Sequence, residues 1–163
     1  MNYTDDSDES LMARHARGDG AAFELLYRRY EVRTWRYLER NVGSHATADG
    51  LMQDVWFIVA RDAASYEPTG RFATWLFWIA HQRLEEHARA SRHQPAPAPE
   101  QLAPITQALA QLPREQRDSY LLQLEGELTV EDISSVTNSA VEMTQARLHY
   151  ARTTLGELLA EPK

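Results

Sequence analysis

The sequence predicts an all-α protein of two small helical domains, the second of them a four-helix domain with a helix-turn-helix. Apolar residues recur with the period of an α-helix through most of the 163 residues. Glycine and proline are scarce inside these periodic stretches. A proline- and alanine-rich segment then divides the chain. We expect an N-terminal domain over residues 1–92, a linker over residues 93–104 and a C-terminal domain over residues 105–163.

Four helices are expected in the first domain. The N-cap of the third is Ser44 or Thr47, because a side-chain hydroxyl there can accept a hydrogen bond from the first turn. A loop over residues 66–70 precedes the fourth helix. The apolar stripes place the first, second and fourth helices over residues 11–16, 21–40 and 72–92, and give the third a face made of Leu51, Val55, Ile58 and Val59.

The linker carries alternating prolines between His93 and Pro99. Proline lacks a backbone donor and favours the extended polyproline form. At ~3.1 Å per residue, twelve such residues would reach roughly 37 Å. The sequence therefore predicts a stiff spacer between the domains.

The C-terminal domain contains the most informative pattern. One helix ends near Leu112, and the next runs from Pro113 to Leu124. Thr129 with Asp132 forms a capping box, and Asn138 suits the left-handed turn that follows. Ser139 with Glu142 repeats the capping pattern and opens a last helix, whose buried face is Leu148, Ala151, Leu155, Leu158 and Leu159. This arrangement predicts a helix-turn-helix, although two capped helices at a short turn also occur in bundles that do not bind DNA.

Composition restricts the function further. The absence of cysteine excludes disulfides and thiolate metal sites. The acidic first ten residues are unlike a signal peptide, and the apolar stretches are too short to span a bilayer, so we expect a cytoplasmic protein. The net charge is −7. Residues 95–163 carry five basic and ten acidic residues, a net charge of −5, whereas a DNA-binding domain usually presents positive charge to phosphate.

The order of several segments resembles the extracytoplasmic-function (ECF) sigma factors of bacterial RNA polymerase. The similar segments are residues 11–14 and 18–30, Leu51-Met52-Gln53-Asp54-Val55-Trp56, residues 66–80, Leu112-Pro113-Arg114-Glu115-Gln116-Arg117 and residues 128–152. The resemblance covers nearly the whole chain. It implies a protein without enzymatic activity or cofactor, whose partners are RNA polymerase core enzyme, promoter DNA and, in many members, an anti-sigma factor.

The resemblance also implies site residues. The residues it assigns to polymerase binding are Asp49, Leu51, Gln53 and Asp54. Melting of the proximal promoter element falls on Tyr66, Arg71, Trp75, Arg83, Arg89 and Arg92, which supply the rings and cations that hold a single strand. Readout of the distal element falls on Val141, Met143, Thr144, Gln145, Arg147 and Arg152 of the recognition helix. Phe72 and Trp75 also suit a plain core position.

Three departures from the family lie at these positions. Thr47 and Gly50 stand where acids are expected, and phosphorylation of Thr47 would return charge there. The recognition helix keeps Arg147 but lacks the family's lysine, which weakens contact with phosphate. In the melting helix, Glu85 and Glu86 replace part of a basic run.

Two other interpretations stay open beside a working sigma factor. The acidic second domain is compatible with a sigma-like regulator that binds polymerase or an anti-sigma factor without reading a promoter. A metal enzyme would use His81, Glu85 and His87, but the His-Glu-x-x-His spacing is missing. We therefore expect these three to be solvated helix residues, with no catalytic or metal site.

Overall fold

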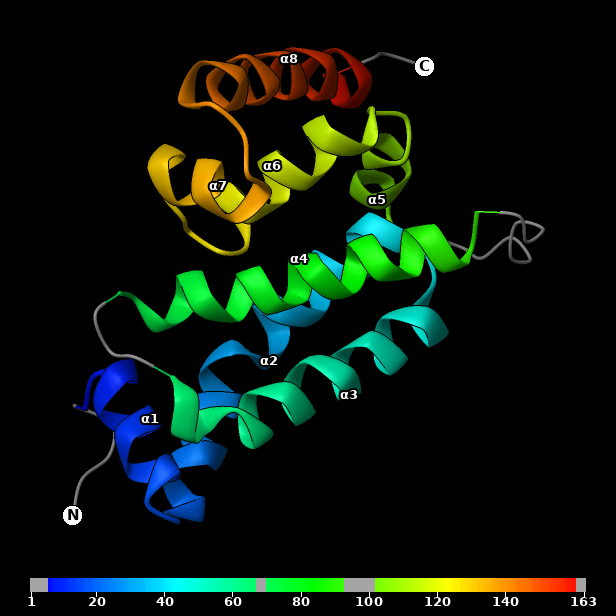
Figure 1. Cartoon of the computed structure of the whole chain (residues 1–163). Helices are drawn as coiled ribbons and strands as arrows, with labels where there is room; N and C mark the ends of the chain where they lie inside the picture. Colours follow the sequence, from blue (N-terminus) through cyan, green and yellow to red (C-terminus); the bar gives the residue numbers. More distant parts are fainter. Residues whose placement is uncertain (1–5, 67–69, 93–101, 161–163) are drawn as a thin grey trace.

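The computed structural model describes residues 6–66, 70–92 and 102–160, and every secondary-structure element in these ranges is a helix, with no strand (Figure 1). The predicted all-α fold is confirmed. The elements are α1 (Asp8–Ala16), α2 (Gly20–Val42), α3 (His45–Arg61), the short 3₁₀ helix η2 (Ala63–Ser65), α4 (Phe72–Ala90), α5 (Pro104–Leu109), α6 (Arg114–Leu124), α7 (Val130–Thr137) and α8 (Val141–Ala160). We refer to residues 6–92 as the first half and to residues 102–160 as the second half.

Local capping signals determine where the helices of the first half begin and end. Gly43 ends α2 in the left-handed conformation, with φ 68°. Of the two predicted caps for α3, Ser44 is the one used, since its hydroxyl accepts from the Thr47 N–H at 3.2 Å. The start of α4 is capped from elsewhere in the chain. The Phe72 N–H donates to a Glu9 carboxylate oxygen of α1 at 2.6 Å.

The first half is built on α2, α3 and α4, with α1 at the end far from α8 (Figure 1). Its core is made of aliphatic and aromatic side chains from all four helices. Tyr37 and Phe77 meet edge to face with ring centroids 5.4 Å apart, and both are fully buried. The core also includes Leu11, Met12, Leu26, Leu38, Val55, Phe72 and Leu76.

The second half has the predicted helix-turn-helix, with one error in its capping. The Thr129 hydroxyl accepts from the Asp132 N–H at 3.1 Å, and Asn138 is left-handed at φ 54° and ψ 50°, both as predicted. Ser139 does not cap α8. Its hydroxyl donates to the Thr137 carbonyl at 3.3 Å and accepts from Arg147 at 2.8 Å.

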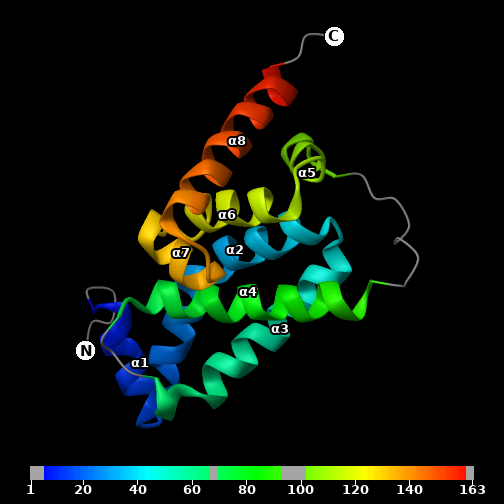
Figure 2. The same ribbon diagram turned by 45° about the horizontal axis from the view of Figure 1, so that its top comes forward.

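The buried face of α8 is shorter than predicted. Leu148, Ala151 and Leu155 are buried, but Leu159 is 50% exposed. The last turn of α8 extends beyond α5 (Figure 2), and there Leu158 stays partly buried while Leu159 faces solvent. The free end of α8 therefore leaves apolar surface open.

The two halves are packed directly against each other, and not held apart by a spacer. The helices α5, α6 and α7 contact α2 and α4, and we call this contact the seam (Figures 1 and 2). At Gly126 a Cβ atom would lie 2.6 Å from the Leu122 carbonyl oxygen and 3.4 Å from the Phe77 ring, so only glycine fits there. Most of the predicted proline linker, residues 93–101, lies outside the described residues. Hydrophobic residues of both halves therefore form one continuous core.

None of the helices described by the structure is long and apolar enough to cross a lipid bilayer.

Candidate functional sites

The first candidate site is an open groove of about 690 Å³ between α2 and α3. Two of the predicted polymerase-binding residues, Asp49 and Gln53, line it and are exposed. The Trp35 indole N–H donates to Asp49 at 2.9 Å, which holds the ring at the edge of the groove. The other lining residues are Tyr27, Glu31, Val32, Arg36, Met52 and Trp56.

The other two predicted polymerase-binding residues lie elsewhere. Leu51 is only 6% exposed and packs into the core, because it belongs to the inward face of α3. Asp54 is exposed but outside the groove lining, with its carboxylate 3.6 Å from Arg83. The groove therefore combines an apolar floor with charged edges, a surface that suits the apolar face of a helix from another protein.

The second candidate site is the aromatic start of α4. Phe72 is fully buried, so the core interpretation holds for this ring. Trp75 is half-buried, with its ring centroid 4.9 Å from that of Tyr66. The Tyr66 hydroxyl is buried without a partner in the described part of the chain, and burial with nearby Glu9 and Asp8 raises its pKa to about 12. Trp78, outside the predicted set, is 44% exposed on the same helix.

Two of the four predicted cations near α4 are already paired within the chain. Arg71 reaches Asp132 of the second half at 3.4 Å. Arg83 lies 2.6 Å from Glu86 as well as 3.6 Å from Asp54. Arg89 and Arg92 are exposed, and neither side chain forms an ion pair among the described residues. The cations open to phosphate are thus at the C-terminal end of the helix.

The third candidate site is the recognition helix α8. Met143 is 51% exposed and Gln145 is exposed, so both reach solvent, while Val141 does so in part. Thr144, which was predicted to contact DNA, is fully buried and donates to the Ala140 carbonyl at 3.2 Å. It lies one turn before Leu148 and so faces the core.

The two arginines of α8 are both engaged by other side chains. Arg147 donates to the Ser139 hydroxyl, and Arg152 donates to Gln123 of α6. Met143 and Tyr150 border a groove of about 300 Å³ between α6 and α8. The exposed surface of the recognition helix is therefore more apolar and amide-rich than cationic.

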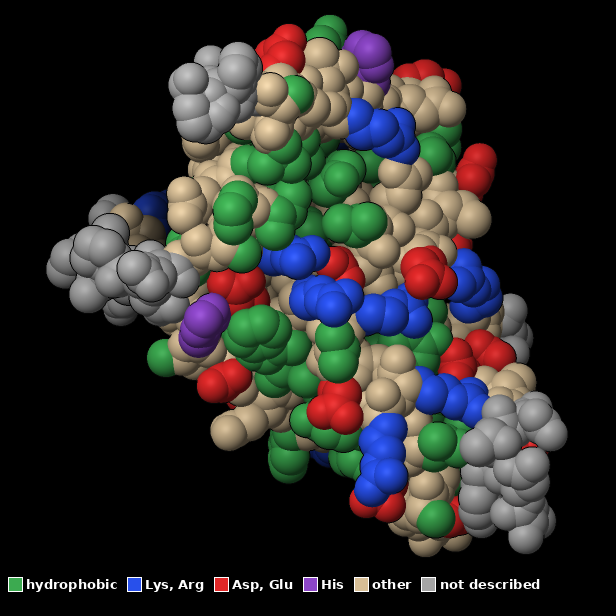
Figure 3. Space-filling view, turned by 180° about the vertical axis from the view of Figure 1, so that it is seen from behind, with side chains coloured by type: hydrophobic (Ala, Val, Ile, Leu, Met, Phe, Trp, Pro, Cys, Tyr) green, Lys and Arg blue, Asp and Glu red, His purple; other side chains and the backbone are tan. Residues whose placement is uncertain are grey.

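Arginines of α2 line the seam, a feature that the sequence analysis did not find. Arg33 donates to the carbonyls of Glu125 and Gly126 at 2.7 and 3.0 Å, where the end of α6 leaves carbonyls without helical partners. Arg40 lies 2.6 Å from the Glu125 carboxylate, and Arg36 lies 3.8 Å from it. Figure 3 shows basic side chains gathered in a band across this face, with acidic side chains among them.

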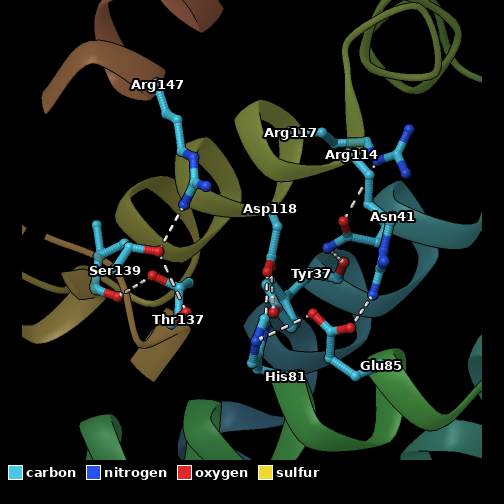
Figure 4. Close-up of polar contacts among 11 residues, drawn as sticks. Tyr37, Asn41, His81, Glu85, Arg114, Arg117, Asp118, Thr137, Ser139 and Arg147 are labelled. Carbon is cyan, nitrogen blue, oxygen red and sulfur yellow. Dashed lines mark hydrogen bonds and ion pairs between the residues drawn. The ribbon is translucent and has the colours of Figure 1, made fainter. Parts of the chain in front are cut away.

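A buried polar cluster joins α2 and α4 of the first half to α6 of the second (Figure 4). Here His81 of α4 is only 7% exposed, so the prediction of a solvated histidine is wrong. Its Nδ1 lies 2.6 Å from Asp118 of α6, and the Tyr37 hydroxyl donates to the same carboxylate at 2.5 Å. Glu85 lies 2.5 Å from Arg114. We call Tyr37, His81, Glu85, Arg114 and Asp118 the His81 cluster.

The His81 cluster combines ion pairs with one hydrogen bond, from Tyr37 to Asp118. No group of three or more histidine and acidic side chains in the described ranges is placed to hold a metal ion. Burial and the adjacent Asp118 raise the pKa of Tyr37 well above its ordinary value, so Tyr37 stays protonated and acts as a donor.

Sequence comparisons match both halves to one family. Residues 26–94 match sigma-70 region 2, and residues 102–155 match sigma-70 region 4. The chain is 30% identical to RNA polymerase sigma factor CarQ of Myxococcus xanthus, over 92% of this chain and 96% of CarQ. It is 28% identical to ECF RNA polymerase sigma factor SigM of Mycobacterium tuberculosis, over 94% of this chain and 85% of SigM.

Solved structures share the fold. CnrH, in complex with the cytosolic domain of CnrY, matches with a TM-score of 0.78 at 23% identity, over 95% of this chain and 98% of CnrH. The sigma factor RpoE of Bartonella quintana, in complex with the anti-sigma factor NepR, matches with a TM-score of 0.70 at 20% identity, over 86% of this chain and 98% of RpoE. With both halves matched in order and the helical fold shared, the chain belongs to the ECF family of RNA polymerase sigma factors, which direct the core enzyme to promoters.

Proposed function

We propose that the groove between α2 and α3 is the surface by which this sigma factor binds core RNA polymerase. The observation that carries the proposal is the position of Asp49 and Gln53 at the edge of an open, largely apolar groove. Exposed apolar side chains such as Val32, 54% exposed, would be covered by a helical partner. Leu51 is buried in the core and does not line the groove, so it is not part of the proposed contact surface.

The proposed promoter contacts are the predicted DNA-binding residues, and their neighbours, whose side chains reach solvent in the structure. On α4 the surface for the melted strand comprises Trp75, Trp78, Arg89 and Arg92, with Arg71 and Arg83 joining when their ion pairs are exchanged for phosphate. On α8 it comprises Val141, Met143, Gln145, Arg147 and Arg152. Gln145 can read adenine through its amide, and Met143 can pack against a thymine methyl group.

The test is in vitro transcription with purified core enzyme, with polymerase affinity measured in parallel. We expect Gln53→Ala and Asp49→Ala each to weaken binding to core roughly ten- to hundredfold, since loss of a hydrogen bond to a charged partner costs about 1.5–3 kcal/mol. Thr153→Ala, on the exposed side of α8, is the control and should bind like wild type. Wild-type affinity in both groove variants would place the polymerase site elsewhere.

A second candidate function is a regulator that binds polymerase without reading a promoter. The observation that favours it is the engagement of Arg147 and Arg152 by side chains of the second half. The same transcription assay separates the two functions. Core binding without open-complex formation on any promoter of a panel supports the regulator and contradicts promoter recognition.

An anti-sigma factor is a further expected partner, because CnrH and RpoE were each solved bound to a protein partner. The site of action would be the cytoplasm, where bacterial core polymerase transcribes, and the chain is expected to have no catalytic activity of its own. The chain would be purified from extracts of its native cell, once with core polymerase present and once after its depletion. A protein that co-purifies with the chain in both cases is such a partner.

A further inference from the structure

We propose that His81 is a protonation-controlled clasp, which holds the second half against the first when its imidazole is charged and loosens when it is neutral. The proposal concerns the free chain and does not depend on which promoter or partner it binds. It rests on where the two ring nitrogens lie and on how the seam is built around them.

Both ring nitrogens of His81 face carboxylates. Nδ1 lies 2.6 Å from an oxygen of Asp118, and Nε2 lies 3.4 Å from an oxygen of Glu85. A charged imidazolium has an N–H for each of them, whereas a neutral imidazole has only one. The neutral ring would therefore turn a lone pair toward one of the two carboxylates. This geometry favours the charged ring as long as the halves are closed.

The two carboxylates belong to different elements, so the clasp crosses the seam. Glu85 is on α4, one turn from His81, while Asp118 is on α6 of the second half. Asp118 is 8% exposed and also accepts from Tyr37 of α2. Closure therefore brings a buried carboxylate of one half to the imidazole of the other, and opening returns both groups to water.

The other groups around His81 come from every element packed against it. A small cavity of about 90 Å³ beside the ring is lined by His81, Glu85, Arg114, Glu115, Asp118, Thr137, Ser139 and Arg147, and Tyr37 lies behind Asp118. Burial by itself lowers the pKa of His81. The close contact with Asp118 and the charge of Glu85 outweigh burial and the opposing Arg114, so the pKa of His81 is raised above its ordinary value.

The direction of the pH effect follows from the raised pKa of His81 in the closed state. The open state titrates near the ordinary histidine pKa of about 6.5, and the closed state titrates higher. The clasp therefore contributes fully to closure below about pH 6.5 and is lost as the pH rises through the closed-state pKa. The closing equilibrium changes about tenfold for each unit between the two pKa values.

Opening of the seam would free arginine side chains that are held by contacts in the closed state. Arg71 is paired with Asp132 across the seam, and Arg147 lines the cavity beside His81. The arginine contacts of α2 with Glu125 and Gly126 do not titrate in this range, so their contribution to closure is the same at any pH near neutral. Protonation of His81 adds to the contribution that these arginines make to closure at every pH.

The experiment measures the distance between the halves directly. The chain has no cysteine, so Ala60→Cys on α3 and Thr153→Cys on α8 give a unique dye pair at exposed positions of the full chain. We expect energy transfer between the dyes to be high at pH 5.5 and to fall as the pH rises to 8.5. His81→Gln should show low transfer with no change over this range. His149→Gln, which removes an exposed histidine of α8, should behave like wild type.

A second variant keeps the test decisive if His81→Gln fails to fold by circular dichroism. Glu85→Gln removes one of the two carboxylates and should move the midpoint of the transition to lower pH. The proposal is overturned by any of three results. These are constant transfer in wild type from pH 5.5 to 8.5, a His81→Gln profile that matches wild type, or an unchanged midpoint in Glu85→Gln.

Discussion

Asp118 is the residue on which the polar part of the seam depends. It is buried, and it accepts from the Tyr37 hydroxyl as well as facing His81. Tyr37→Phe leaves one of its oxygens without a donor, so we expect the free energy of unfolding to fall by about 1–3 kcal/mol. Urea denaturation at pH 7 measures this. Tyr150→Phe, at a ring 58% exposed, is the control and should change stability by less than about 0.5 kcal/mol. Equal effects of the two variants would contradict a buried hydrogen bond at Tyr37.

Thr47 is the residue at which added charge should strengthen polymerase binding. It lies in the first turn of α3, where its N–H is bonded to the Ser44 cap, and the groove residue Asp49 follows on the same helix. Negative charge at a helix N-terminus is stabilised by about 0.3–1 kcal/mol. On binding, the same charge can form a surface ion pair with a cation of the polymerase, which contributes about 0.2–1 kcal/mol. Thr47→Glu should therefore raise affinity for core polymerase up to roughly fivefold, as measured by titration with labelled chain. Thr47→Gln supplies the neutral control. If both variants bind alike, charge at this position has no role and the phosphorylation hypothesis fails.

At the scale of elements, the turn between α7 and α8 positions the recognition helix. Asn138 occupies the left-handed region at φ 54°, where residues other than glycine and asparagine cost about 1–2 kcal/mol. Asn138→Ala should lower the free energy of unfolding by about 1 kcal/mol, and Asn138→Gly should lower it by a few tenths at most. Thermal unfolding followed by circular dichroism distinguishes them. Alanine tolerated as well as glycine would show that the turn does not depend on this conformation.

The same turn shows which parts of this protein could be predicted from its sequence. The helix start at Thr129 and the helix end at Asn138 depend on neighbours within four residues, so composition and spacing are sufficient to predict them. The capping role of Ser139 is wrong because α8 begins at Val141, so Ala140 stands at the cap position and the Ser139 hydroxyl bonds to Thr137 and Arg147 instead. The resemblance placed Leu51 and Thr144 among the contact residues, although both turn inward. For Leu51 the helical period had indicated this, since it belongs to the apolar face of α3.

The seam could not be predicted from the sequence because the residues that meet across it are far apart in the chain. Arg33 and Gly126 are 93 positions apart, and Tyr37 and Asp118 are 81 apart. His81 looked like a solvated helix residue because the carboxylate that buries it belongs to the other half. The proline-rich segment suggested separated domains, and nothing in its composition indicates that α6 and α7 return onto α2 and α4.

At the scale of the whole molecule, charge limits what the chain can do without polymerase. The net charge is −7, and residues 95–163 carry −5 of it. DNA affinity falls with salt by about 0.9 log units per phosphate contact for each log unit of salt. The recognition helix offers two cations, Arg147 and Arg152, so the free chain should bind a promoter duplex weakly, with a log–log slope near −2.

Fluorescence anisotropy between 50 and 200 mM salt measures this slope, and Arg152→Gln should reduce its magnitude by about one. Arg17→Gln, at the exposed end of α1, should leave it unchanged. A slope steeper than about −5 would reveal a basic DNA-binding face outside the recognition helix. Addition of core polymerase should turn the weak binding into tight, promoter-specific binding, because the enzyme holds the two halves on DNA together and supplies contacts that the acidic second half lacks.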